Sequence, residues 1–322
     1  MEQPARLDNG LPDNQVLLRE FDELLSGEDY SPNTRDAYLR FVRPFLTDRP
    51  SPENLDRYDV GRFLLEWRNR LSAGSLRLAT SALIKFYKFL KFYHGYRNAD
   101  TVINHIKDLK GEFFHTRTFQ PDPLSEKEIM SLYQYTLGRN QRSQRRRCIL
   151  TVLLGTGLRV SEFCNLTQEQ ITIHEPGTPS HISIPSGKTA SARRKIPLHR
   201  NFEFSNKWIL GERVIDALDQ YKKVRPKSRG THENNYWFIS ERGTPLSTRS
   251  VQSMITRLAK KSGLQEKRSS NNKSTISVHN LRHSFATILA RQGASAYQIK
   301  SILGHASVST SQAYIRFIER VG

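Results

Sequence analysis

The chain has 322 residues, 37% of them hydrophobic, which suffices for two globular domains that each bury a core. It has no run of about 18 apolar residues, and its first segment, MEQPARLDNGLPDNQ, has no apolar stretch, so we expect neither a membrane span nor a signal peptide. The net charge of +19 is uneven: residues 1–110 carry 17 basic and 16 acidic groups, and residues 111–322 carry 33 and 15. Such an excess is typical of nucleic-acid-binding proteins, although a basic surface or one that binds anionic membranes shares it.

Apolar residues at helical spacing predict four helices in the first third of the chain. Gly27 follows the first, and Ser31-Pro32 opens the second, which Pro44 should kink or end. The third and fourth cover about residues 59–71 and 75–93.

The fourth helix carries both apolar and basic residues. Those that we expect to face the core are Leu78, Leu83, Phe86, Tyr87, Leu90 and Tyr93. Its basic residues Arg77, Lys85 and Lys88 are tentative DNA contacts, although a solvated helix face explains each of them equally well.

A boundary follows where the helical period is lost. Gly111, Pro121 and Pro123 fall in this stretch, and the two prolines keep the chain extended. We therefore predict a linker over residues 111–123, between a helical, DNA-binding domain at 14–110 and a second domain at 124–322.

The second domain mixes helices with short strands, so the fold class is mainly α with a small β-sheet. A capping box opens its first helix at Ser125, and a basic run that includes Arg145 and Arg146, both tentative DNA contacts, enters an apolar helix. The remaining predictions are strands at about 171–173, 181–185 and 193–198, helices at about 206–223, 248–262, 279–292, 296–303 and 308–319, and a loose polar loop at 261–275.

Two cysteines, Cys148 and Cys164, lie among apolar residues. No CxxC pair exists, so the sequence does not support a zinc cluster. We interpret both as buried free thiols of a protein in the reducing cytoplasm.

Several polar residues of the second domain have settings that suit chemistry. Arg159 follows Gly155-Thr156-Gly157, and Glu162 lies three residues on, where it can fix the arginine. His279 and Arg282 are at i and i+3 of a predicted helix and project toward one spot. His283 is one residue further and is expected to point elsewhere. By itself, the Arg159–Glu162 pair is more often structural than functional.

Further candidates lie on turns and on the last helix. Lys188 is at a hairpin tip, and Arg193 and Arg194 just beyond suit backbone phosphates. His305 follows a helix that ends at Gly304, and Tyr314 is nine residues later, a position at which packing alone is the usual role.

The set as a whole suits cutting and rejoining of a nucleic-acid backbone. Two guanidinium groups can clamp a phosphodiester, because each presents a planar fork of donors. Histidines and a lysine can move protons, and a tyrosine hydroxyl can hold a phosphoryl group covalently.

These residues and their settings resemble the tyrosine recombinase, or phage integrase, family. The segment TGLRVSEFCNL is similar to the first family box, and HNLRHSFATILARQGASAYQIKSILGHASVSTSQAYIRF is similar to the second. SGKTASARRKIPL resembles the family's lysine hairpin, although it reads GKT where relatives often read GKG. SPNTRDAYLRFVRPFL resembles the start of the SAM-like core-binding domain. The general pattern of these motifs resembles that of the Xer-like, integron and transposon recombinases.

The resemblance implies a role for each residue. Arg159, Arg282 and His305 would bind the scissile phosphate, with Glu162 in support. His279 would accept the proton of the nucleophile Tyr314, and Lys188 would protonate the departing 5′ oxygen. Tyr314 would form a 3′-phosphotyrosyl link, and no metal or other cofactor is implied.

The resemblance also implies a site-specific DNA recombinase acting in integration, excision or resolution. It would be monomeric or weakly associated without DNA, and a homotetramer on two duplex DNA sites in the nucleoid. Only eight residues follow Tyr314, so the tail contact with a neighbouring protomer is expected to be absent, reduced or made by another segment. The alternatives are a type IB topoisomerase-like enzyme and a non-catalytic DNA-binding protein.

Overall fold

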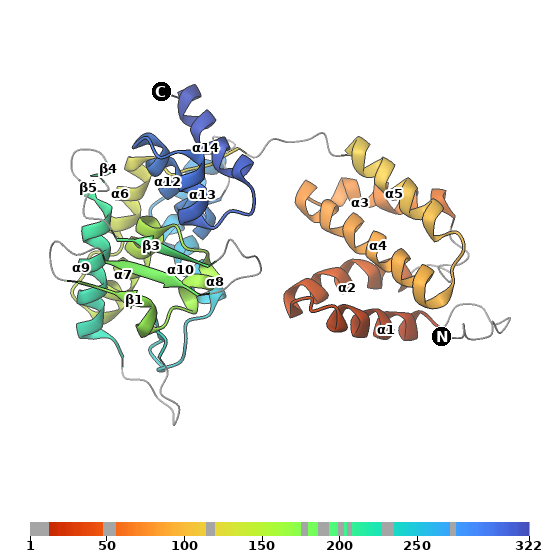
Figure 1. Cartoon of the computed structure of the whole chain (residues 1–322), viewed down its shortest axis with the longest axis horizontal. Coiled ribbons are helices and arrows are strands. Elements are labelled where there is room, and N and C mark those ends of the chain that lie inside the picture. Colours follow the sequence, from red (N-terminus) through yellow and green to blue (C-terminus); the bar gives the residue numbers. More distant parts are fainter. Residues whose placement is uncertain are drawn as a thin grey trace. The chain divides into compact units, whose positions relative to one another are not determined.

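The computed structural model describes residues 13–47, 56–113, 120–174, 180–185, 193–198, 203–204, 208–226, 235–270 and 275–321. Over these residues the chain is mostly helical with a small sheet, as the sequence predicted, and it has a second small sheet that was not predicted. It divides into two compact units, Met1–Thr118 and Phe119–Gly322 (Figure 1). In the part that the structure describes, none of the helices combines the length and apolarity needed to cross a membrane.

In its described residues, the first unit is a group of five helices around one hydrophobic core. The helices are α1 (Asn14–Gly27), α2 (Pro32–Thr47), α3 (Arg57–Arg70), α4 (Ala73–His94) and α5 (Ala99–Phe113). Side-chain caps explain several starts: Asp13 accepts from the Gln15 amide, Asp56 forms a capping box with Asp59, and Ser72 caps α4. Aromatic pairs fill the centre, with Phe21 against Phe86 and Phe45 against Phe63 and Tyr87.

The sequence was partly wrong about this unit. Helix α2 continues past Pro44 for one more turn, to Thr47. Leu78 and Tyr93 were expected inside but are exposed, because they lie off the stripe that α4 turns to its neighbours. Helix α5 was not predicted, and it extends into the segment interpreted as a linker.

The second unit holds the remaining elements. Its helices are α6 (Glu126–Gln134), α7 (Gln141–Thr156), α8 (Val160–Cys164), a 3₁₀ turn η2 (Gln168–Gln170), α9 (Leu210–Val224), α10 (Thr248–Lys261), α11 (Leu264–Ser270), α12 (Val278–Arg291), α13 (Ala296–Leu303) and α14 (Val308–Val321). Its strands are β1 (Ile171–Thr172), β2 (His181–Ile184), β3 (Arg194–Pro197), β4 (Glu203–Phe204) and β5 (Trp208–Ile209).

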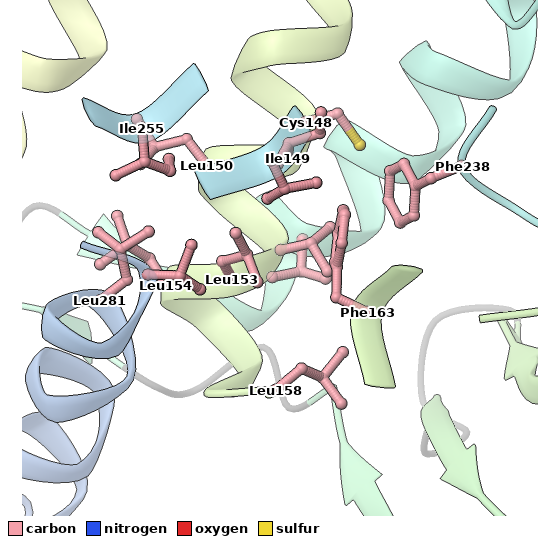
Figure 2. Close-up of a cluster of buried hydrophobic side chains, with 14 of the residues drawn as sticks. Cys148, Ile149, Leu150, Leu153, Leu154, Leu158, Phe163, Phe238, Ile255 and Leu281 are labelled. Carbon is pink, nitrogen blue, oxygen red and sulfur yellow. The ribbon is translucent and has the colours of Figure 1, made fainter. Parts of the chain in front are cut away.

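Helix α7 forms the centre of this unit. Every residue from Cys148 to Thr156 is buried, so this half of the helix has no solvent face. Phe163 of α8, Phe238, Ile255 of α10 and Leu281 of α12 surround it (Figure 2). The two cysteines are buried free thiols, as predicted, and burial raises the pKa of Cys164 to about 11. A helix that is apolar on all sides must be covered by other elements. The C-terminal end of α7 therefore lies deep in the unit.

The three predicted strands form one antiparallel sheet in the order β1-β2-β3, which confirms the prediction. Ile182 is opposite both Ile171 and Ile196. Residues alternate between buried and less buried positions along β2 and β3, as expected for a sheet with one covered face. A second small sheet pairs β4 with β5.

The loose loop predicted at 261–275 is wrong for much of its length, because residues 264–270 form α11. Leu264 is buried, and Arg268 is only 1% exposed despite its charge. Arg268 donates to Asp122 and to Glu128, which lie before and within α6. Asn280 of α12 also bonds Asp122, so this cluster fixes the start of α12.

Candidate active site

Helix α7 ends at Thr156 and is capped by Gly157, whose positive φ of 60° reverses the chain toward Arg159. Arg159 then occupies the position that caps α8. Its backbone amide donates to one Glu162 oxygen at 2.8 Å, and its guanidinium donates to the other at 2.9 Å. Glu162 therefore holds Arg159 in one orientation, as its spacing suggested.

Arg282, on α12, is buried beside the end of α7. It donates to the carbonyl oxygens of Gly157 at 2.6 Å and Leu303 at 2.7 Å. A guanidinium carries five N–H donors, and these two bonds leave others to face a ligand. Burial and the nearby Arg159 lower the pKa of Arg282 to about 10, so it stays charged at neutral pH.

The C-terminal end of α13 joins three arginines. The carbonyl oxygens of Ile302, Leu303 and Gly304 accept from Arg194, Arg282 and Arg159, each at 2.7 Å. The last carbonyls of a helix have no partner within it and carry partial negative charge, which favours cations there. The end of α13 thus gathers side chains from β3, α12 and the start of α8 around the residue that follows, His305.

Arg194 corrects a prediction. It was expected to contact a DNA phosphate, but it is only 8% exposed. Its guanidinium forms a two-pronged pair with Glu162, at 3.0 and 2.9 Å, besides the bond to Ile302. Burial would raise the pKa of Glu162, but these bonds and those from Arg159 outweigh it and lower that pKa. Arg194 therefore supports the Arg159–Glu162 pair from inside.

Tyr314, on α14, lies in the same place. Its side chain is 1% exposed, and its ring stacks on that of His305, with centroids 6.1 Å apart and planes 8° apart. Its hydroxyl forms a 2.7 Å hydrogen bond with Nδ1 of His283. Burial raises the pKa of Tyr314 to about 12, and nearby Arg282 opposes that rise.

His283 was wrongly expected to point away from the site. It is four residues after His279, so both imidazoles project from one side of α12, and their ring centroids are 6.4 Å apart. That i, i+4 spacing is the signal that could have found it. Burial, followed by His279, lowers the pKa of His283 to about 4, so its ring is neutral at neutral pH.

His305 is a buried, neutral histidine. Burial and Arg282 lower its pKa to about 3. Its Nδ1 bonds the buried hydroxyl of Ser311 at 2.8 Å. If that hydroxyl donates to Nδ1, the imidazole proton is on Nε2, where it can be donated to a phosphate.

Among the other predicted site residues, His279 lies near the two arginines. His279 is exposed on α12, although burial of part of its ring, Arg282 and Arg159 lower its pKa. Lys188 lies outside the described residues. Arg77, Lys88 and Arg193 are exposed, Lys85 is paired with Glu28, and Arg145 is paired with Glu241.

The described residues contain no group of three or more His, Cys, Asp and Glu side chains arranged to hold a metal. What they bring together is a pair of arginines, neutral histidines and a phenol. Such a set can bind a phosphate, take up a proton and supply an oxygen nucleophile.

Solved structures share this fold. The lambda integrase(75-356) dimer bound to a COC′ core site has a TM-score of 0.68 at 18% identity, covering 92% of this chain and 96% of that one. The Tn1549 transposon integrase in complex with circular intermediate DNA has a TM-score of 0.67 at 20% identity, covering 95% and 99%. The architecture is thus that of the integrases.

Sequence comparison is more specific. The model of the phage integrase family matches residues 123–319, and that of the phage integrase N-terminal SAM-like domain matches residues 17–91. Tyrosine recombinase XerC of Listeria innocua is 30% identical over 94% of this chain and 93% of its own length. Tyrosine recombinase XerA of Pyrococcus furiosus is 29% identical over 93% and 89%. The chain belongs to the phage integrase family and is a tyrosine-type site-specific recombinase of the Xer-like type.

Proposed function

We propose that this recombinase cuts and rejoins duplex DNA with Tyr314 as the nucleophile and Arg159 and Arg282 as the clamp on the scissile phosphate. The observation that carries the proposal is the convergence of these three side chains at the end of α13, where Tyr314 and Arg282 alter each other's pKa. The integrases of similar fold were solved with DNA, which supports duplex DNA as the partner.

The chemistry is a balanced exchange of one phosphoester for another. The Tyr314 oxygen attacks phosphorus, the bond to the 5′ oxygen breaks, and a 3′-phosphotyrosyl link forms. The 5′ oxygen takes a proton from an acid, a role that the family resemblance assigns to Lys188. Rejoining is the reverse, and the bond energy stays in the covalent link.

The arginines would supply most of the charge stabilisation. Each uses two donors on the protein, which fixes its plane and leaves others for the phosphate oxygens. His305 would add a donor from Nε2. Donors fixed before the reaction stabilise developing charge without reorganising, which is usually the largest contribution to catalysis.

The phenol proton needs an acceptor, because a group with a pKa of about 12 is not ionised at neutral pH. The 2.7 Å bond to neutral His283 supports this residue as the acceptor, whereas the family resemblance implied His279. Because Tyr314 is only 1% exposed in this state, we propose that α14 shifts when DNA enters.

We also propose how the whole molecule works. The domain at 14–110 and the domain at 124–322 would bind one duplex from two sides. Four protomers would bring two sites together in the nucleoid and exchange strands in pairs through a Holliday junction. A related enzyme that only nicks and reseals one duplex would relax supercoils without producing recombinants in a two-site assay.

The test is covalent trapping on a nicked DNA substrate that releases its short 5′ fragment and so prevents rejoining. The wild type is expected to form a covalent protein–DNA complex, and Tyr314→Phe to form none while binding DNA with nearly the same affinity. The control is Tyr297→Phe, which removes an exposed hydroxyl from the same unit and should leave trapping unchanged. A covalent complex with Tyr314→Phe would show that another residue is the nucleophile.

A further inference from the structure

The start of the second unit is fastened to α12 by side chains that the proposed chemistry does not use. Residues 122–124, the entry segment, lie close to the point where this unit begins. Helix α12 contributes Arg282, His279 and His283 to the site. The contacts between the entry segment and α12 therefore bear on how these three side chains are held.

Asn280 uses both ends of its side-chain amide. Its oxygen accepts from the backbone N–H and the hydroxyl of Ser277, each at 2.9 Å, which closes the capping box of α12. Its nitrogen donates to the backbone carbonyl of Asp122 at 3.0 Å and to the Asp122 carboxylate at 3.1 Å. Asn280 is only 3% exposed, so a lost partner could not be replaced freely by water. One side chain thus joins the first turn of α12 to the entry segment.

Ser284, one turn further along α12, makes a second attachment. Its hydroxyl donates to the Asn280 carbonyl and accepts from the backbone N–H of Leu124, both at 2.8 Å. Asn280 and Ser284 are four residues apart, so they lie on one face of the helix. Attachment at two points on one face restrains the rotation of α12 about its axis as well as its sliding.

Arg268 fixes the carboxylate that Asn280 binds. It donates to Oδ1 of Asp122, whereas Asn280 donates to Oδ2, and it also donates to Glu128 of α6 at 2.9 Å. The side chain of Arg268 is 1% exposed and that of Asp122 is 31% exposed. A buried ion pair adds little net stability compared with apolar side chains of similar size, because both ions lose hydration. Orientation of the Asp122 carboxylate is therefore the more informative property of this cluster.

The rotation of α12 matters because catalytic side chains share the attached turn. Arg282 and His283 lie between Asn280 and Ser284 in the sequence. A rotation of α12 by about 20° would move a side-chain atom about 5–6 Å from the axis by roughly 2 Å. Misplacing a catalytic group by about 1 Å can cost about 100-fold in rate.

Asp122 also acts on His283 through its charge. Burial is the main reason that the pKa of His283 is lowered to about 4, and the negative charge of Asp122 opposes this fall. The carboxylate that orients α12 thus also keeps the imidazole a better proton acceptor.

We propose that Asp122 and Asn280 are positioning residues of the recombinase, and that their contact sets the rotation of α12. That rotation aims Arg282 at the scissile phosphate and His283 at the Tyr314 hydroxyl. The inference rests on the proposed function, because it explains how the groups of that mechanism are held. Neither positioning residue is assigned a chemical step.

The test is an exchange of the two side chains. Asn280→Asp keeps the oxygen that closes the capping box but replaces the donor to Asp122 with a second carboxylate. On saturating nicked substrate, its single-turnover cleavage should be slower by about tenfold to hundredfold, with little change in DNA affinity. Adding Asp122→Asn places a donor and an acceptor opposite each other again, so the double variant should recover most of the lost rate.

The matched control adds Glu266→Gln to Asn280→Asp. Glu266 is exposed on α11, so this change removes the same charge as Asp122→Asn at a position outside the cluster, and it should restore nothing. Equal recovery of the rate by the two added changes would mean that net charge matters and the contact does not, which would overturn the proposal.

Asp122→Ala keeps the test decisive if Asn280→Asp does not fold. The fold should tolerate it, because Arg268 keeps its bond to Glu128 and Asn280 keeps its bond to the backbone carbonyl at position 122. We expect severalfold slower cleavage than with Glu266→Ala, at the same DNA affinity. Equal cleavage rates of these two variants would contradict the positioning role.

Urea unfolding and DNA affinity separate positioning from a merely structural role. If the variants lose stability but cleave saturating substrate at the wild-type rate under conditions where they are folded, the cluster only supports the fold and the proposal fails. Parallel losses of affinity and cleavage would assign the effect to DNA binding and would also overturn it. A wild type that forms no covalent complex would overturn the proposed function, and this inference with it.

Discussion

The phenol of Tyr314 combines two properties that work against each other. It is close to Arg282, which would stabilise the phenolate, yet burial holds its pKa at about 12. A neutral histidine at 2.7 Å resolves this, because it can take the proton as the oxygen attacks. In the proposed mechanism, this single residue would therefore decide how the reaction depends on pH.

At this scale we predict that His283→Ala changes the pH profile of cleavage. The wild-type rate should be nearly flat around neutral pH, because His283 has a pKa of about 4 and is already an acceptor. Without His283 the proton of Tyr314 must go to solvent. The cleavage rate of the variant should therefore be lower than that of the wild type at neutral pH, and it should increase with pH by up to tenfold per pH unit. Single-turnover cleavage of the nicked substrate at several pH values measures both.

The comparison is His279→Ala, the change at the acceptor that the family resemblance implied. We expect it to keep the flat profile. If His279→Ala shows the rising profile and His283→Ala does not, the proton goes to His279 and His283 only holds the resting phenol.

At the scale of elements, the end of α13 organises the site. Its last carbonyls bind Arg194, Arg282 and Arg159, which come from three other elements. Leu303 also packs against the end of α7 at Gly157. The position of the clamp thus depends on how closely α7, α12 and α13 approach one another.

We predict that Gly157→Ala is strongly destabilising. A Cβ there would lie 2.5 Å from Phe285 Cδ1 and 2.6 Å from Leu303 Cδ2, besides the strain of a positive φ. The strain costs about 1–2 kcal/mol and the overpacking about 1–3 kcal/mol more in the free energy of unfolding. Urea unfolding measures the sum.

Gly293→Ala provides the control, because Gly293 also has a positive φ and has nothing within 4 Å of its added Cβ. It should show only the cost of strain. Equal destabilisation by the two changes would mean that the contact of α7 with Phe285 and Leu303 is loose.

At the scale of the whole molecule, the buried neutral histidines link stability to pH. His305 and His283 have pKa values of about 3 and 4, below the ordinary 6.5. Between about pH 4 and pH 6.5 these histidines bind protons in the unfolded chain but not in the folded chain. Their contribution to stability is therefore complete above about pH 6.5 and is lost as the pH falls toward 4.

We predict that the free energy of unfolding falls steeply from about pH 6.5 to pH 4, and that His305→Asn makes this fall shallower. The lowered pKa of Glu162 adds loss of stability in the same direction at acid pH. Urea unfolding across this range is the measurement, with His174→Asn, at an exposed position, as the control. A slope that His305→Asn leaves unchanged would contradict the prediction.

The sequence predicted the helices and strands well where a local signal was strong. Helix α13 was predicted with its bounds, and the three strands of the sheet were predicted nearly so, because caps, glycines and apolar period are local properties. It failed for α11 and for the role of Arg194. Arg268 finds its partners 140 and 146 residues away, and Arg194 bonds a carbonyl 108 residues away.

By itself, then, the sequence determined the kind of chemistry, since two arginines, histidines and a tyrosine in recognisable settings suit phosphoryl transfer to a phenol. Only the tertiary structure decided which polar side chains are buried and which residues they bind. In it, His283 forms a hydrogen bond with the Tyr314 hydroxyl, and Arg194 pairs with Glu162. The physical reason is that charge and spacing are properties of neighbouring residues in the sequence, whereas burial and hydrogen-bond partners depend on which distant elements pack together.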